Sequence, residues 1–446
     1  MATAKLAPES LSILRSRLAE ARRETDGLFA LLREDALGDR PIPERHRLIF
    51  YLGHVEAFDW NLFGPGAFEL PSIHPEFDKL FAFGIDPVDG KLPNEPASAW
   101  PRPAEVRNYN SRVRERIDAA LSATRGALPP QVVDGTLLNV AIEHRMMHAE
   151  TLAYLFHQLP YENKLPASTR PRVTAEISHG ASGSELRKMR EIARGVATLG
   201  MQSGDGFGWD NEFEQHCVDV APFRIREFPV TNGEFLEFIR SGGYEEKGSW
   251  NAEDWKWKGA TGISHPLFWT RNGDKWEYRG MFEQIPLPMD WPVYVSHAEA
   301  AAFAQWRKQS LPTEAQWHRA AYGTLGSGER RFPWGDEAPS QERGNFDFHH
   351  WDATPVSAHP GGQSAFGVQD LLGNGWEWTA TPFAAFPGFK PFPFYPGYSA
   401  NFFDGKHYVM KGGSARTAAC MLRRSFRNWF QPHYPYVYAK FRTVEV

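Results

Sequence analysis

The chain of 446 residues is longer than one hydrophobic core usually organises, so its length predicts two domains. A net charge of −5 without a basic block argues against nucleic acid or an anionic membrane as the main partner. No apolar run of membrane-spanning length and no signal-peptide pattern occur, so the protein is expected to be cytoplasmic. Cys217 and Cys420 are too few for a disulfide framework and are expected to be buried thiols.

Residues 8–160 carry apolar residues at helical spacing in four segments, which predicts a helical bundle. The second segment runs from about Pro43 to Leu62, and the fourth from about Gln131 to Leu159. Pro160 should end the fourth helix.

Three histidines fall on the apolar sides of these helices. His144 and His148 are four residues apart, so on a helix they lie about 40° apart around the axis and can reach one ion. His54 continues the apolar stripe of the second segment and also faces inward. Because bundle cores often hold metal between facing helices, these three histidines are the candidate ligand set.

The residues alone leave two interpretations of this trio open. Each histidine could be a hydrogen-bonded core residue, although burying two unpaired imidazoles side by side is costly. Alternatively the three hold a metal, and imidazole suits Zn, Fe, Cu and Ni alike. Glu150 is expected to point away from the pair, as a partner of a ligand or as a solvated charge.

The rest of the chain follows another pattern. Residues 161–199 are expected to be a linker with a short helix near Ser184 to Ala193. Residues 200–446 consist of short apolar runs broken by Gly, Pro, Asn and Asp, with helices expected at Asn232 to Ser241 and Ser296 to Lys308. The sequence therefore predicts an α+β protein in which a bundle over 1–160 precedes a mixed, loop-rich domain.

Five ordered motifs resemble the formylglycine-generating-enzyme fold, over about residues 198–446. They are Trp209-Asp210-Asn211-Glu212, Pro229-Val230-Thr231-Asn232, Leu311-Pro312-Thr313-Glu314-Ala315-Gln316-Trp317, Pro333-Trp334-Gly335 and Gly373-Asn374-Gly375-Trp376-Glu377-Trp378-Thr379. The resemblance implies a C-type-lectin-like core. That family's copper-binding cysteine pair is absent after Gly412-Gly413-Ser414, which disfavours sulfatase maturation.

A His-x3-His helix in a DinB-like bundle ahead of this fold resembles the ergothioneine-type sulfoxide synthases (EgtB-like enzymes). Those enzymes use non-heme Fe(II) and O2 to join a thiol, cysteine or gamma-glutamylcysteine, to the imidazole ring of hercynine, which is trimethylated histidine. By position and order, the resemblance implies that His54, His144 and His148 hold the iron.

The same resemblance assigns roles in the second domain. Tyr395 takes the place of a catalytic tyrosine, which would donate a proton or hydrogen during oxygen reduction. Tyr398 takes the place of a substrate-contacting tyrosine, and Arg427-Asn428-Trp429 resembles the segment that holds hercynine. Trp429 and Tyr398 would form a cage for its quaternary ammonium. Asn428, in the same segment, is also expected to bind the substrate. The Trp-Glu-Trp-Thr motif is expected to have a structural role.

Three differences from the family's sequence pattern bear on the identity of the thiol donor. Phe430 stands where the gamma-glutamylcysteine branch carries an aspartate, and Met147 where that branch has a glutamine near the substrate. The branch that accepts free cysteine has a tyrosine pair after its second helix, which Leu80-Phe81-Ala82-Phe83-Gly84-Ile85 lacks.

Alternative functions remain open on the sequence. Ovothiol-type or selenoneine synthases are related enzymes, so histidine or a selenol donor could replace hercynine or the thiol. The three histidines could instead hold Zn or Ni in a DinB-like thiol transferase, or pack a non-catalytic binding module. The site is expected between the domains, and the oligomeric state is open.

Overall fold

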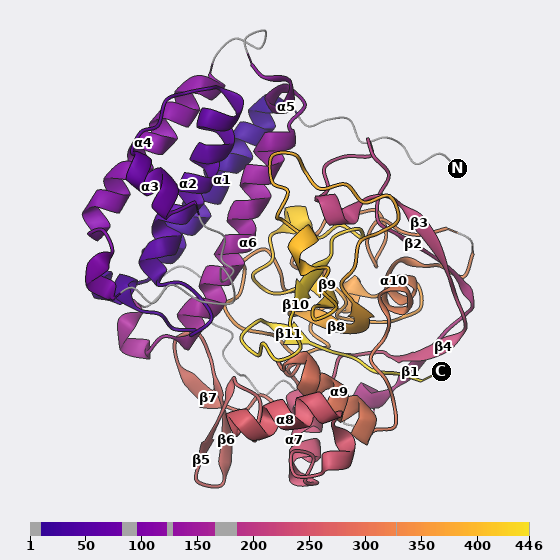
Figure 1. The fold of residues 1–446 in the computed structure, drawn as a ribbon. Helices are drawn as coiled ribbons and strands as arrows, with labels where there is room; N and C mark the ends of the chain where they lie inside the picture. Colours follow the sequence, from indigo (N-terminus) through magenta and orange to yellow (C-terminus); the bar gives the residue numbers. More distant parts are fainter. Residues whose placement is uncertain (1–9, 83–95, 123–127, 166–184, 327, 446) are drawn as a thin grey trace. The chain divides into compact units, whose positions relative to one another are not determined.

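The computed structural model describes residues 10–82, 96–122, 128–165, 185–326 and 328–445. The chain divides into two compact units, Met1–Ser168 and Thr169–Val446 (Figure 1).

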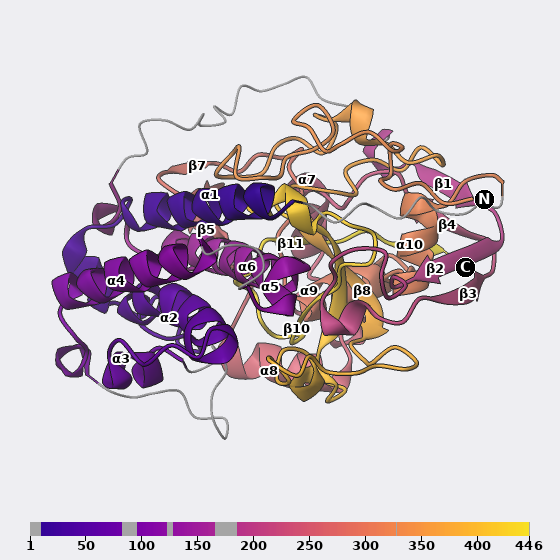
Figure 2. The same ribbon diagram turned by 90° about the horizontal axis from the view of Figure 1, so that it is seen from above.

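The first unit is the expected helical bundle. Its long helices α1, α2, α4 and α6 lie alongside one another, with α1 packed on α6 and α2 on both α4 and α6 (Figure 2). The helices are α1 Leu11–Phe29, α2 Leu48–Ala67, α3 Pro75–Leu80, α4 Pro103–Leu121, α5 Pro130–Val133 and α6 Thr136–Gln158. Short 3-10 turns cover Glu34–Gly38, Ala97–Ala99 and Tyr161–Asn163.

Helix α2 begins five residues later than expected and continues through Pro65 to Ala67. Arg47 is the extended N-cap residue, and its guanidinium donates to the carbonyl oxygen of Gly38 at 2.6 Å. Most residues of α2 are buried, because neighbours cover the helix on several sides.

The fourth predicted helix is divided at Gly135. Its φ of 83° lies in the left-handed region that glycine adopts without strain, and this separates α5 from α6. A Cβ there would also come within 2.7 Å of Leu14. The expected C-terminus is confirmed, since α6 ends at Gln158, just before Pro160.

The described residues of the second unit form four small sheets among long loops. The strand orders are β1-β4-β12, β10-β9-β8-β11, β2-β3 and β5-β6-β7. The strands are β1 Met189–Ile192, β2 Gly195–Leu199, β3 His216–Val220, β4 Phe223–Arg226, β5 Trp269–Asn272, β6 Lys275–Arg279, β7 Gln284–Pro286, β8 Gly375–Pro382, β9 Tyr408–Gly413, β10 Asn428–Phe430, β11 Ala439–Lys440 and β12 Val444–Glu445. Together with the bundle, this confirms the α+β class.

The prediction of a short helix near Ser184 to Ala193 is wrong. Ser184 lies outside the described residues, Glu185–Arg187 forms one 3-10 turn, and Met189–Ile192 forms β1. This strand pairs antiparallel with β4, with Met189 opposite Arg226. Pairing with a segment distant in sequence overrides the local helical pattern.

Both expected helices of the second unit are present, as α7 Asn232–Arg240 and α9 His297–Trp306. Two further helices, α8 Ala252–Thr261 and α10 Glu314–Tyr322, were not expected. Helix α10 carries a sequence signal that could have revealed it: Thr313 and Gln316 form a capping box around its first turn.

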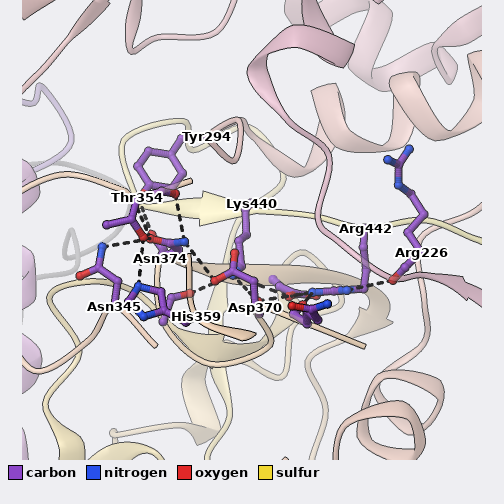
Figure 3. Close-up of polar contacts among 12 residues, drawn as sticks. Arg226, Tyr294, Asn345, Thr354, His359, Asp370, Asn374, Lys440 and Arg442 are labelled. Carbon is purple, nitrogen blue, oxygen red and sulfur yellow. Dashed lines mark hydrogen bonds and ion pairs between the residues drawn. The ribbon is translucent and has the colours of Figure 1, made fainter. Parts of the chain in front are cut away.

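A buried polar network holds the Trp-Glu-Trp-Thr strand β8 in place (Figure 3). Arg442 donates to both carboxylate oxygens of Glu377, at 2.6 and 2.7 Å, and Lys440 lies 2.9 Å from a carboxylate oxygen of Asp370. The amide oxygen of Asn374 accepts from the backbone N–H of Thr354 at 2.9 Å. All these groups are buried, so the motif has the structural role expected for it.

The cysteine expectation is wrong, because Cys217 is exposed and Cys420 half-buried. Cys217 lies on β3, where alternate side chains of a two-stranded sheet face solvent. Across the described ranges, no helix has both the length and the apolar composition needed to cross a membrane.

Candidate functional site

The three predicted histidines meet in the core of the bundle. His54 comes from α2, and His144 and His148 from consecutive turns of α6. One ring nitrogen from each lies within 4.8 Å of the others, and each side chain is at most 3% exposed. Three convergent nitrogens at this spacing can surround one metal ion.

A backbone hydrogen bond orients His54. Its Nδ1 lies 2.6 Å from the carbonyl oxygen of Phe81, and a carbonyl only accepts, so Nδ1 carries the hydrogen. Nε2 therefore keeps its lone pair, and no hydrogen-bond partner for it lies among the described residues. Fixing one nitrogen as donor so that the other can bind metal is common for ligating histidines.

Burial keeps the imidazoles neutral, as metal binding requires. Removal from water lowers the pKa of His54 to about 4, although the hydrogen bond to Phe81 opposes the shift. Burial also lowers the pKa values of His144 and His148 well below the usual range, and the neighbouring histidines add to the effect.

Aromatic rings pack against the site. The Phe58 ring stacks on His144 with centroids 3.4 Å apart, and Phe50 stacks on His54 at 4.9 Å. The sequence places Phe58 on the same apolar stripe as His54, whereas Phe50 was not singled out. They restrict the imidazole orientations.

The sequence also led to predictions for two other residues of α6, Met147 and Glu150. Met147 is half-buried, and its carbonyl oxygen accepts from Thr151 at 3.1 Å. Glu150 is 8% exposed, so the alternative of a solvated charge is wrong. It lies on α6, most of whose residues are buried.

A buried charge cluster clamps the two ligand-bearing helices together. Arg145, adjacent to His144, donates to both carboxylate oxygens of Glu56 at 2.9 Å and to Asp59 at 2.6 Å. Burial acts to raise the pKa of Glu56, but Arg145 and Arg114 outweigh it and hold the value at about 2. This cluster was missed because a charged residue between histidines gives no sign that it faces inward.

The second unit brings the predicted tyrosines and Trp429 into one aromatic cluster. The centroids of Tyr395 and Tyr398 are 5.6 Å apart, and Tyr398 meets Trp429 edge-on at 5.4 Å. Trp209 stacks on Tyr398 at 4.0 Å, and Phe383 stacks on Trp429 at 4.2 Å. Electron-rich faces gathered this way suit a quaternary ammonium.

Asn428 and Phe430 flank Trp429 on β10, which pairs antiparallel with β9. Because side chains alternate along a strand, both point to the face opposite Trp429. Phe430 stacks on Tyr434 with centroids 5.2 Å apart. The structure thus groups Tyr395, Tyr398 and Trp429 and gives Asn428 and Phe430 a different orientation.

Two motifs distant in sequence support the aromatic cluster. Asp210 accepts from Ser399 at 2.5 Å, which anchors the loop carrying Tyr398 to the Trp209-to-Glu212 motif. Glu314 accepts from Arg427 at 3.0 and 3.1 Å, just before β10. Asp210 and Glu314 belong to motifs that were recognised in the sequence, but the sequence did not indicate their partners.

The segment Leu80 to Ile85, expected to lack a donor-binding tyrosine pair, is described only in part. Phe83, Gly84 and Ile85 lie outside the described residues. The described part includes Phe81, whose carbonyl orients His54.

Comparisons with known proteins agree with this arrangement of domains. Residues 17–152 match the DinB superfamily, and residues 175–446 match the sulfatase-modifying factor enzyme 1-like domain. A protein named hercynine oxygenase from Mycobacterium tuberculosis is 36% identical over 343 residues, which cover 76% of this chain and 77% of the relative. The chain belongs to the hercynine oxygenase family.

Other relatives extend the match along the chain. A hercynine oxygenase from Mycolicibacterium thermoresistibile is 32% identical over 425 residues, which cover 93% of this chain and 87% of that protein. Ergothioneine biosynthesis protein 1 of Neurospora crassa is 28% identical, and the match covers 93% of this chain and 55% of that relative. The predicted resemblance, a DinB-like bundle before a formylglycine-generating-enzyme-like domain, is confirmed.

Proposed function

We propose that this protein is a non-heme Fe(II)- and O2-dependent sulfoxide synthase that joins a thiol to the imidazole ring of hercynine. The observation that carries the proposal is the trio His54, His144 and His148, whose nitrogens lie within 4.8 Å of one another in a member of the hercynine oxygenase family. The family relationship favours an oxidative enzyme over a binding module.

The donor set suits Fe(II). Three neutral imidazoles leave the charge of a divalent ion uncompensated, and an octahedral ion keeps three positions for other ligands. Bound there, iron would supply a place where substrate, thiolate and oxygen meet and a route for electrons between them. His54, His144 and His148 would hold it.

The overall reaction balances without a further reductant. A ring C–H bond and the thiol S–H bond break, while a C–S bond and an S–O bond form. This removes four electrons, and O2 accepts all four. One oxygen atom ends in the sulfoxide and the other in water.

The proposed roles of the second unit rest on its aromatic cluster and on the resemblance described above. Trp429 and Tyr398 hold the trimethylammonium group of hercynine, and their edge-on contact at 5.4 Å supports this role. Asn428, on the face of β10 opposite Trp429, is proposed to contact hercynine away from its trimethylammonium group. Tyr395 is proposed to donate a proton during oxygen reduction, which directs oxidation toward C–S bond formation.

The donor is proposed to be cysteine or gamma-glutamylcysteine, and Met147 and Phe430 are proposed to contact it. Phe430 stacks on Tyr434 and offers no carboxylate to a donor amino group. That observation favours a donor that does not need this charge. It is equally compatible with a second candidate function, C–Se bond formation with a selenol donor.

The other partners follow from the same proposal. The substrates are small molecules, hercynine or histidine together with the donor and O2, and neither nucleic acid nor a membrane is involved. A cytoplasmic location is proposed, and an exposed Cys217 thiol is compatible with a reducing compartment.

The test is anaerobic loading with Fe(II), followed by air. Hercynine or histidine is offered with cysteine, gamma-glutamylcysteine or a selenosugar, and products are read by mass spectrometry. The proposal expects a sulfoxide or a selenium adduct from at least one pair. No product from any pair would refute it.

Parallel samples loaded with Zn or Ni separate the thiol transferase alternative. The proposal expects oxygen uptake and product with Fe(II) alone. Thiol transfer with Zn or Ni in the absence of oxygen would favour the alternative instead.

A further inference from the structure

A pocket of about 550 Å³ in the second unit has three arginines in its wall. Arg190 lies on β1, whereas Arg330 and Arg343 belong to loops that follow α10. Trp334 and the loop from Pro360 to Gly367 complete the wall, and no aspartate or glutamate is among its described lining residues. The pocket therefore presents positive charge.

The positive charge is only partly neutralised by neighbours. Arg190 lies 2.8 Å from a carboxylate oxygen of Glu227, and Arg343 pairs with Glu337. Arg330 donates to the carbonyl oxygen of Pro333 at 3.1 Å, and within the described ranges it forms no ion pair. At least one guanidinium of the wall thus has no compensating carboxylate.

A fourth guanidinium lies behind the wall. The Cζ atom of Arg319 is 5.1 Å from the ring centroid of Phe366, which lines the pocket. Arg319 is only 4% exposed, its Nε has no hydrogen-bond partner, and no described carboxylate pairs with it. Burying an unpaired charge is costly, so an anion nearby would offset that cost.

The arginines are held in place before any ligand arrives. Arg343 donates to the carbonyl oxygen of Gly361 at 2.6 Å, which fixes its guanidinium at the rim. Gly367 has a φ of 77°, and a Cβ on it would come within 3.1 Å of the Arg190 guanidinium. Fixed donors bind an anion with less loss of side-chain entropy.

We propose that this pocket binds a phosphate group, either free phosphate or the phosphate of a small ester. Phosphate carries a charge of about −1.5 to −2 at neutral pH and offers three oxygens that accept from guanidinium forks. A single carboxylate could accept bidentate hydrogen bonds from only one guanidinium. The volume exceeds one phosphate and leaves room for the organic part of an ester.

The test is isothermal titration calorimetry of the full chain at constant ionic strength, with inorganic phosphate, adenosine monophosphate and acetate as probes. The decisive variant is Arg330→Gln, because the Arg330 side chain has one described hydrogen bond, to the carbonyl oxygen of Pro333. The matched control is Arg331→Gln. Arg331 is the adjacent residue, and its exposed guanidinium is not in the described lining of the pocket.

We expect phosphate or the monophosphate to bind the wild type and the Arg331→Gln variant equally, and Arg330→Gln at least about tenfold more weakly. Tighter binding of the monophosphate would identify an ester as the ligand, and tighter binding of inorganic phosphate the free ion. Absence of binding to the wild type, equal binding by both variants, or acetate binding as tight as phosphate would overturn the proposal.

Discussion

Arg145 of α6 and Glu56 of α2 form a bidentate ion pair with both N–O distances at 2.9 Å. Both side chains are fully buried. Arg145 directly follows His144, and Glu56 lies two residues after His54. The pair therefore joins the two helices at the level of the proposed iron ligands.

Replacing one partner should disturb both the fold and the metal site. Glu56→Gln leaves Arg145 buried with one carboxylate fewer, and such losses cost roughly 3–5 kcal/mol. We expect the free energy of unfolding, measured with denaturant, to fall by that amount. We also expect the affinity for Fe(II), measured by anaerobic titration, to weaken about tenfold. The control is Glu20→Gln on α1, whose exposed pair with Arg23 at 3.9 Å should contribute little. A Glu56→Gln variant as stable as this control would show that the clamp is unimportant.

Tyr395→Phe tests the proposed proton donor. The substitution keeps the ring that contacts Tyr398 and Trp209, so the packing of the aromatic cluster is retained. Loss of the hydroxyl should divert the reaction from the sulfoxide toward the sulfinic acid of the thiol, in which both oxygen atoms of O2 go to sulfur. Mass spectrometry of the two products gives the ratio. An unchanged ratio would refute the role of Tyr395.

Trp429→Leu tests the proposed cage for the trimethylammonium group. Cation–π contacts contribute about 1–2 kcal/mol, so KM for hercynine should rise roughly five- to thirtyfold. Histidine lacks the quaternary charge, and its KM should change less, which provides an internal control. An equal rise for both substrates would indicate that Trp429 only supports the fold.

His297 gives the second unit a pH-dependent stability. Burial lowers its pKa to about 4, against the opposing effects of Asp254 and the Thr379 carbonyl, so the folded protein keeps it neutral. Below pH 6.5 the unfolded chain binds a proton that the folded chain does not, and stability falls as the pH drops toward 4.

His297→Gln should remove this dependence. Between pH 7 and pH 5 the wild type should lose about 2 kcal/mol more stability than the variant. Other histidines contribute equally to both proteins and cancel in the comparison. Parallel curves of unfolding free energy against pH would contradict the prediction.

The histidine trio could be predicted from sequence because helical periodicity alone places residues 54, 144 and 148 on inward faces. The Phe81 carbonyl that orients His54 could not, since a backbone group leaves no mark in the sequence. The buried ion pairs of Arg145 could not be predicted either, because its two carboxylate partners, Glu56 and Asp59, lie on another helix. Contacts between distant segments, unlike periodicity, depend on the packed structure.

The same limit explains the error at β1. Residues 189–192 have no strong alternation, and their extended form depends on pairing with β4. By contrast, the capping box of α10 is local, and Thr313 with Gln316 could have predicted that helix. The motif order in residues 209–379 identified the fold even where single strands were not predicted.

His54, His144 and His148 are proposed to hold an iron that uses O2 to form the C–S bond. Turnover of the Fe(II)-loaded protein with hercynine and cysteine or gamma-glutamylcysteine under isotopically heavy O2, followed by mass spectrometry, tests this role of the iron. We expect a sulfoxide that carries one heavy oxygen atom, and we expect His148→Ala to lose this product while His74→Asn retains it. A sulfoxide without the label, or undiminished product in His148→Ala, would contradict it.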